Sequence, residues 1–171
     1  MRTPSRLAWG GAAALALLGA ALWLSLGRRP ARDRRPLAGV PAASLVRLER
    51  TLDGETLTLS LHAGRWRAGG KDAEPAACRA LVDGARQLSL GAAVSEDPGA
   101  YESFGLSDQR AVRLKVFAEG AAAPALDAYF GKPAFGEALY ARLAEETPVF
   151  VETGLGAAAL TLPATAFLLK P

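Results

Sequence analysis

The sequence predicts a mainly antiparallel α+β domain with one principal helix, preceded by an N-terminal transmembrane helix. Residues 7–26 form a run of 20 residues without a charge or a proline. At about 1.5 Å per residue, a helix of that length crosses the roughly 30 Å hydrocarbon core of a bilayer. Residues 44–171 contain several segments in which apolar and polar residues alternate, which is typical of half-buried strands. One stretch among them has apolar residues at helical spacing, so strands and a helix share one domain.

The predicted organisation places one folded domain behind the membrane anchor. Its parts are a short N-terminal tail (1–6), a transmembrane anchor (7–26), an Arg/Pro-rich linker (27–43) and the α+β domain (44–171). A helix buried in a soluble core rarely runs this long without a polar stripe. A cleaved signal peptide is the stronger alternative, because Arg2 and Arg6 precede the apolar run. That run is longer than the usual stretch of about 7–15 residues, and no small-x-small cleavage site follows it.

The residues that flank the apolar run favour a membrane interface. Trp9 and Trp23 lie near its two ends, where amphipathic rings prefer the headgroup region, and Arg28 and Arg29 follow it. The orientation is contested. By the positive-inside rule, the five arginines between residues 28 and 35 favour a cytoplasmic domain. An N-terminal anchor ahead of one large domain is also a common means of export, and we expect an inner-membrane protein with a periplasmic domain.

Charge separates the membrane-proximal segment from the domain. The whole chain carries +3, but its first 36 residues hold seven arginines and one aspartate. The remaining residues hold 13 basic and 16 acidic side chains, which argues against a nucleic-acid partner. We expect the partners to be the lipid bilayer and other membrane or envelope proteins. Ala12, Ala16 and Ala20 recur every four residues, a spacing that permits self-association through the transmembrane helix.

The elements of the domain follow from periodicity and turn signals. In chain order the predicted elements are strands over 44–50, 56–62 and 65–67, a helix from 72–75 to about 89, strands over 91–95, 112–117, 126–130, 138–144 and 149–152, and a short helical end within 162–169. In the first strand, Val46 and Leu48 are expected on the apolar face. Asp53-Gly54 is a strong hairpin signal, and Pro75 suits the first turn of a helix.

A loop with two aromatic residues separates the two runs of strands. Tyr101, Phe104, Gly105 and Leu106 follow Asp97-Pro98 within ten residues. Aromatic and leucine side chains in a loop usually pack back onto a core, so we expect a packing or interaction loop. Stacking on a ligand is the alternative reading.

Few residues in the sequence could take part in catalysis or metal binding. The chain has one histidine and one cysteine, His62 and Cys78, and we expect no catalytic, cofactor-binding or metal residues. The segment from Gly154 to Ala159 fits the pattern G-x-G-x-x-A. A dinucleotide site also needs a following helix, a further strand and a distal acid, and Pro163 interrupts such a helix. A pair of carboxylates acting as general acid and base remains an alternative.

Several motifs also carry a resemblance to a known family. They are Gly64-Arg65-Trp66, the helix with Leu81 and Leu88, Asp97-Pro98-x-x-Tyr101-x-x-Phe104-Gly105-Leu106, Gly131, Tyr140-Ala141-Arg142 and Val149-Phe150-Val151. Over roughly residues 44–171 the chain resembles the bacterial domain of unknown function 4340 family. The resemblance implies a membrane anchor followed by a β-rich module, without established catalytic residues. Members of the family often carry more than one such module, and this chain has room for one. It also lacks the proline that commonly follows the Gly-Leu-Asp step, since Gly105-Leu106 continues as Ser107-Asp108-Gln109.

These observations favour a non-catalytic, membrane-anchored binding or scaffold module of a bacterial cell-envelope complex. Some members of the family are similar to proteins encoded beside ABC-type exporters, which implies an accessory role by association. Two alternatives stay open. One is an envelope hydrolase that acts on glycan or peptide through carboxylates. The other is a cytoplasmic domain tethered beside a membrane ATPase, as the five arginines after the anchor suggest.

Overall fold

The computed structural model describes residues 34–169. The predicted anchor over 7–26 lies outside these residues, as do Trp9, Trp23, Arg28 and Arg29. Within the described residues, no helix is both long enough and apolar enough to cross a membrane.

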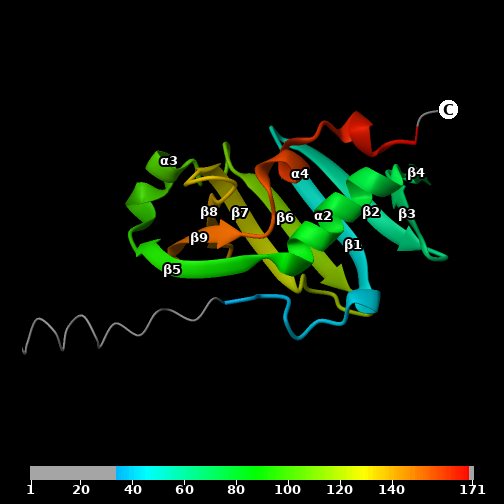
Figure 1. Cartoon of the computed structure of the whole chain (residues 1–171), viewed down its shortest axis with the longest axis horizontal. Helices are drawn as coiled ribbons and strands as arrows, with labels where there is room; N and C mark the ends of the chain where they lie inside the picture. The colour runs from blue at the N-terminus through cyan, green and yellow to red at the C-terminus, as the bar shows by residue number, and fades with distance from the viewer. Residues whose placement is uncertain (1–33, 170–171) are drawn as a thin grey trace, which may run out of the picture. The chain divides into compact units, whose positions relative to one another are not determined.

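One antiparallel sheet of nine strands organises the described chain, in the order β4-β3-β2-β1-β6-β7-β8-β9-β5 (Figure 1). The strands are β1 (Leu45–Leu52), β2 (Glu55–His62), β3 (Arg65–Ala68), β4 (Lys71–Asp72), β5 (Ser89–Ser95), β6 (Val112–Ala118), β7 (Leu126–Pro133), β8 (Leu139–Leu143) and β9 (Val149–Thr153). Two meanders, β1 to β4 and β6 to β9, meet where β1 pairs with β6. The mainly antiparallel α+β fold is thereby confirmed.

Tight turns set the register of the first meander. The β1–β2 turn is Asp53-Gly54 and the β2–β3 turn is Ala63-Gly64, and all four residues have positive φ. Two-residue turns of this kind match the right-handed twist of the paired strands. The Asp53-Gly54 hairpin is confirmed.

The apolar face of β1 differs from the prediction. The ladder between β1 and β6 shifts its register between Leu45 and Arg47, which marks a β-bulge. As a result Leu45 and Leu48 are both buried, whereas Val46 is only half-buried. The expectation that Val46 lies on the core face with Leu48 is therefore wrong, because simple alternation holds only without a bulge.

The principal helix, α2 (Pro75–Gln87), connects opposite edges of the sheet and crosses one of its faces (Figure 1). The Glu74 carboxylate caps it by accepting the Ala77 N–H at 2.7 Å. Cys78, Leu81 and Ala85 are buried against the sheet. The helix begins at Pro75, the last residue of the predicted start, because residues 71–72 pair with β3 as the additional strand β4.

Glycines allow α2 to meet the segment that follows β9. A Cβ at Gly84 would lie 2.6 Å from Leu155 Cδ1, and a Cβ at Gly154 would lie 2.3 Å from the Gln87 carbonyl oxygen. Gly154 also has a φ of 104°. This close approach accounts for the first glycine of the G-x-G-x-x-A pattern. The helix that follows, α4 (Ala157–Thr161), is only five residues long.

The C-terminal segment is tied to the sheet by a buried arginine. Arg50, 2 % exposed, donates hydrogen bonds to the carbonyls of Leu160 (3.0 Å) and Leu162. Its guanidinium also lies 5.3 Å from the centre of the Phe167 ring. The short 3-10 helix η3 (Ala164–Phe167) lies within the predicted helical end, whereas α4 has no counterpart in the prediction.

Part of the predicted linker belongs to the folded domain. Arg34 exchanges two main-chain hydrogen bonds with Leu90 of β5, at 2.8 and 2.7 Å, and its guanidinium pairs with Glu146 at 2.8 Å. Leu37 is 5 % exposed and lies in the main core. The compact unit therefore begins near residue 33 and not near residue 43, because Leu37 supplies apolar surface that the core buries.

Candidate functional site

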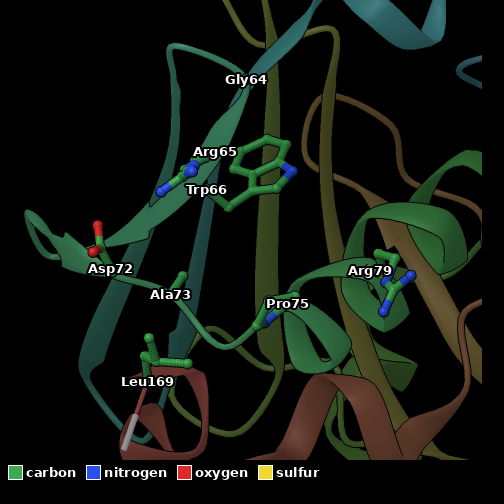
Figure 2. Close-up of a pocket in the computed structure, with 8 residues that line it drawn as sticks. All are labelled: Gly64, Arg65, Trp66, Asp72, Ala73, Pro75, Arg79 and Leu169. Atoms are coloured by element: carbon green, nitrogen blue, oxygen red, sulfur yellow. The ribbon is translucent and has the colours of Figure 1, made fainter. Parts of the chain in front are cut away.

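An open groove lies at the β3–β4 edge of the sheet, and we call it the Trp66 groove (Figure 2). It is lined by Gly64, Arg65, Trp66, Asp72, Ala73, Pro75, Arg79 and Leu169. These residues come from the β2–β3 turn, β3, β4, the first turns of α2 and the C-terminal segment. The volume of the groove is about 480 Å³, within the range of roughly 300–1,000 Å³ that is typical of small-molecule sites.

Main-chain hydrogen bonds fix the shape of the groove. The Ala73 N–H donates to the Trp66 carbonyl at 3.1 Å, and the Leu169 N–H donates to the Asp72 carbonyl at 3.1 Å. These bonds hold the start of α2 and the C-terminal segment beside β3. Trp66 is half-buried and packs partly against the core, while Leu169 is 55 % exposed. The groove thus offers an indole and aliphatic groups on a rigid main chain.

The charges along the groove are unusual within this domain. Arg65 and Arg79 are exposed, and neither has a carboxylate within 4 Å among the described residues. Apart from Arg35, every other described arginine makes an ion pair or, like Arg50, donates to main-chain carbonyls. The one acid of the groove, Asp72, is already 3.7 Å from Arg67. The groove can therefore offer two free guanidinium groups to an anion.

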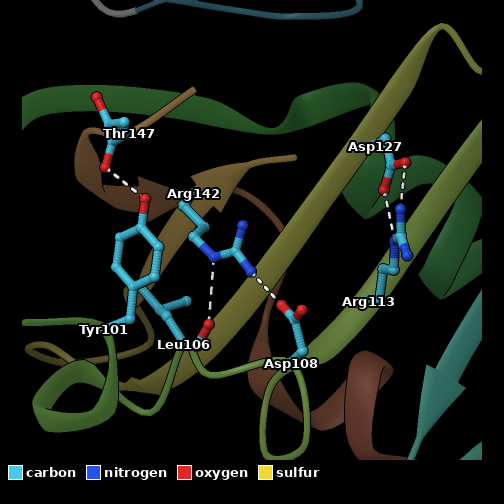
Figure 3. A network of polar contacts seen from close by, with 7 residues as sticks. All are labelled: Tyr101, Leu106, Asp108, Arg113, Asp127, Arg142 and Thr147. Atoms are coloured by element: carbon cyan, nitrogen blue, oxygen red, sulfur yellow. Dashed lines mark hydrogen bonds and ion pairs between the residues drawn. The ribbon is translucent and has the colours of Figure 1, made fainter. Parts of the chain in front are cut away.

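A second polar arrangement lies on the opposite face of the sheet from α2, centred on Arg142 (Figure 3). Arg142 is 7 % exposed and donates to the Leu106 carbonyl at 3.2 Å and to the Asp108 carboxylate at 2.5 Å. Its guanidinium lies 3.7 Å from the centre of the Tyr129 ring and 4.7 Å from that of Tyr101. Arg142 thus holds the preceding loop to β7 and β8.

The four residues singled out in the aromatic loop pack against the sheet. The segment is partly helical, with η2 (Pro98–Ala100) and α3 (Tyr101–Phe104) where the sequence predicted a loop. Phe104 lies 4.6 Å from Tyr140 between ring centres, and Leu106 is fully buried. The Tyr101 hydroxyl donates to the Thr147 carbonyl at 2.8 Å. Gly105 ends α3 with a φ of 71°, which few side chains tolerate.

Two buried titratable groups lie outside the groove. Burial raises the pKa of the Glu152 carboxyl to about 7, and the hydrogen bond from the Leu155 N–H, at 2.7 Å, opposes that rise. The second carboxyl oxygen of Glu152 is buried without a hydrogen-bond partner among the described residues. Burial, with a smaller contribution from Glu74, raises the pKa of the Cys78 thiol to about 11. Such a thiol is almost wholly protonated at neutral pH.

The other residues that could catalyse a reaction or bind a metal do not form a cluster. His62 is exposed at the end of β2. Within residues 34–169, no group of three or more His, Cys, Asp or Glu side chains could hold a metal ion. Glu102 and Asp108 line one pocket, but Glu102 pairs with Arg110 at 2.8 Å and Asp108 pairs with Arg142.

Sequence reasoning found Trp66 as part of a motif but did not find the groove. Arg79 and Leu169 are 90 positions apart in the chain, and nothing in either segment signals that both approach β3. Arg50, Arg142 and Glu152 were missed as buried charges. Arg50 and Glu152 occupy core-facing positions in their strands, so a polar residue at an apolar position of the alternation was the available signal. Arg142 lies on the other face of β8 from Ala141 and Leu143, so the alternation gave no signal for its burial.

The fold and these sites define a single β-rich module with an open groove at one sheet edge and a packed aromatic loop on one face. The family profile for the domain of unknown function DUF4340 matches residues 66–168, which is more than half of the chain, and the chain belongs to this family. The match contains the β3 tryptophan, α2, the aromatic loop and η3. No curated protein and no solved structure matches the chain significantly.

Proposed function

We propose that this protein is a non-catalytic, membrane-anchored binding or scaffold module of a bacterial cell-envelope complex. The observation that most supports this function is the Trp66 groove. Its lining combines an indole, two guanidinium groups that have no carboxylate partner within residues 34–169, and aliphatic side chains, on a main chain held by hydrogen bonds. Aromatic and arginine side chains are the types enriched where proteins recognise other molecules.

The anchor in this proposal is the 20-residue apolar run over 7–26. Because Arg34 is already bonded to β5, the segment that connects the anchor to the domain is residues 27–33. Seven residues reach at most about 25 Å, at roughly 3.3–3.6 Å per residue. The proposed module therefore works close to a membrane, where an accessory role beside an exporter would require it to be.

Membrane topology tests the location. Alkaline phosphatase fused after Pro171 in one chain, and a fluorescent protein that matures only in the cytoplasm in another, report opposite sides of the membrane. We expect active phosphatase and a dark fluorescent reporter. The reverse result would contradict the periplasmic assignment and favour the cytoplasmic partner of a membrane ATPase. Signal in a soluble fraction freed of membranes would contradict the anchor.

Co-purification tests the role as a module of a complex. The full chain, tagged at its C-terminus and expressed at its native level, is isolated in mild detergent beside the variant Arg65→Glu/Arg79→Glu. We expect the same envelope proteins in repeated isolations of the unaltered chain and their loss from the variant. The variant Arg35→Glu, which changes another exposed arginine that has no ion pair in the described part of the chain, should retain them. Isolation of the protein alone would contradict the proposal.

A further inference from the structure

We infer that the Trp66 groove binds an acidic peptide segment of a partner protein, with an apolar side chain against the indole and carboxylates at Arg65 and Arg79. This inference rests on the proposed function, since it names the chemistry of the partner at the same groove. It depends on three properties of the described residues: exposed apolar surface, unpaired positive charge and the position of the groove in the sheet.

The apolar part of the groove is a preformed surface. The half-buried Trp66 packs against the hydrophobic core, and Ala73, which also lines the groove, is 8 % exposed. Leu169, at 55 % exposure, is among the three most exposed large apolar side chains of residues 34–169. An apolar side chain placed against the indole would remove apolar surface from water, which is the main source of affinity at such sites.

The two arginines of the groove favour a negatively charged ligand. Arg65 and Arg79 extend from β3 and α2, on two sides of the indole (Figure 2). A guanidinium group presents its N–H donors in a planar fork that matches a carboxylate. Asp72 would oppose an anion at its own rim of the groove, but Arg67 offsets that charge. Arg65 extends to the same side of the indole as Asp72, and Arg79 lies on the α2 side, so the charge of Asp72 opposes an anion least at Arg79 (Figure 2).

The position of the groove at a sheet edge favours an extended peptide. The groove lies at the β3–β4 edge of the nine-stranded sheet. In addition, β4 pairs only with Arg67 and Ala68 of β3 before the chain turns into α2. An extended peptide segment can lie beside such a sheet edge.

Nuclear magnetic resonance on the full chain in neutral detergent micelles tests this inference. Tryptophan labelled with 15N gives few indole signals, because the chain has three tryptophans, and Trp66→Phe identifies the signal of Trp66. The probes are acetyl-Phe-Glu-Glu-amide and its uncharged match, acetyl-Phe-Gln-Gln-amide. We expect the acidic peptide to shift the Trp66 indole signal with an affinity at least about tenfold higher than that of the match.

Three variants locate the binding. Arg65→Gln and Arg79→Gln should each lower the affinity for the acidic peptide severalfold, and the double variant should abolish the preference over the uncharged match. Arg35→Gln should have no effect, although it removes an equally exposed charge. These side chains are exposed, so the variants should keep the same fold, which an unchanged spectrum outside the groove verifies.

Other outcomes overturn the inference. Equal shifts with both peptides would show that the arginines do not select an acid. No shift of Trp66 at about 10 mM acidic peptide, a concentration that detects even very weak binding, would exclude this occupant. In nanodiscs, broadening of the Trp66 signal with phosphatidylglycerol but not with phosphatidylcholine would assign the groove to anionic lipid instead. Each of these results would leave the topology and co-purification experiments free to support the proposed module.

Discussion

Single charged side chains inside the fold show how burial changes their chemistry. Glu152 is 0 % exposed on β9, and across the strands it faces Leu90 and Leu139. Desolvation therefore favours its protonated form. Arg50 is buried as well, and burial lowers its pKa, while the main-chain carbonyls of Leu160 and Leu162 accept hydrogen bonds from its guanidinium. Arg50 holds the Leu160 carbonyl of α4, whereas one carboxyl oxygen of Glu152 has no hydrogen-bond partner among the described residues.

The raised pKa of Glu152 predicts that the domain loses stability as pH rises. Burial raises the pKa of Glu152 from its ordinary value of 4.5 to about 7, so the folded state binds the proton more tightly than the unfolded chain does. The free energy of unfolding should therefore decline from about pH 4.5 to about pH 7 by roughly 3 kcal/mol and change little above that range. Urea unfolding of the full chain at pH 5 and pH 8 measures this decline.

The variant Glu152→Gln separates this effect from the rest of the titration. It should show a smaller decline between the two pH values, because the amide does not ionise. Glu137→Gln, a change at an exposed position, should decline like the unaltered chain. An unaltered pH dependence in Glu152→Gln would show that Glu152 does not carry the effect.

At the scale of elements, short motifs act by joining segments that are distant in sequence. The aromatic loop is held by Arg142, which lies 36 positions after the Leu106 carbonyl that it contacts. In the same way Gly154 allows the end of β9 to approach the end of α2. Both motifs resemble functional signatures in the sequence, and in the structure both have packing roles.

Arg142→Leu should loosen the aromatic loop. The change removes the hydrogen bonds to Leu106 and Asp108, so we expect a loss of about 2 kcal/mol in the free energy of unfolding. Hydrogen exchange measured by mass spectrometry should accelerate over residues 97–110. Arg110→Leu breaks an exposed ion pair on the same segment and should change neither quantity much. Equal effects of the two variants would contradict the role of Arg142 as the central contact.

Gly84→Ala tests the contact between α2 and the segment after β9. In an isolated helix this change stabilises by roughly 1 kcal/mol. Here the new Cβ would lie 2.6 Å from Leu155 Cδ1, so we expect a net loss of stability, measured by urea unfolding. Alanine at Gly39, where nothing lies within 4 Å of an added Cβ, should cause no such loss. A gain in Gly84→Ala would show that Leu155 moves aside easily.

At the scale of the whole molecule, one core spans both meanders and the N-terminal segment. It contains Leu37, strand residues such as Leu48 and Leu114, and Phe167 near the C-terminus. The pairing of β1 with β6 joins the two meanders along the sheet, and α2 joins its two edges. Residues 34–40 therefore belong to the same folded unit as the strands.

Leu37→Ala tests where the domain begins. Removal of a buried leucine side chain typically costs about 2–5 kcal/mol, and we expect a loss toward the lower end because Leu37 lies at the margin of the core. Pro41→Ala, at an exposed position of the same segment, should have a much smaller effect. Equal stability of Leu37→Ala and the unaltered chain in urea unfolding would place the start of the domain after residue 40.

Much of the fold could be predicted because its signals are local. The alternation of β2, the Asp53-Gly54 turn and the helical spacing of Cys78, Leu81 and Ala85 depend on neighbours within a few residues. The missed features depend on distant contacts. A β-bulge in β1 moves Val46 off the core face. Lys71 and Asp72 form β4 only because they pair with β3. The helix α4 forms where Arg50 donates a hydrogen bond to the Leu160 carbonyl.

By itself, the sequence determined the fold class, the approximate element boundaries and the family resemblance, since periodicity and turn chemistry act over short distances. The tertiary structure decided the strand order, the start of the domain at residues 34–37 and the existence of the Trp66 groove. These depend on which segments meet in space. Arg79 and Leu169 reach Trp66 only because α2 crosses the sheet and the C-terminal segment returns to its edge, and such long-range packing leaves no local signal.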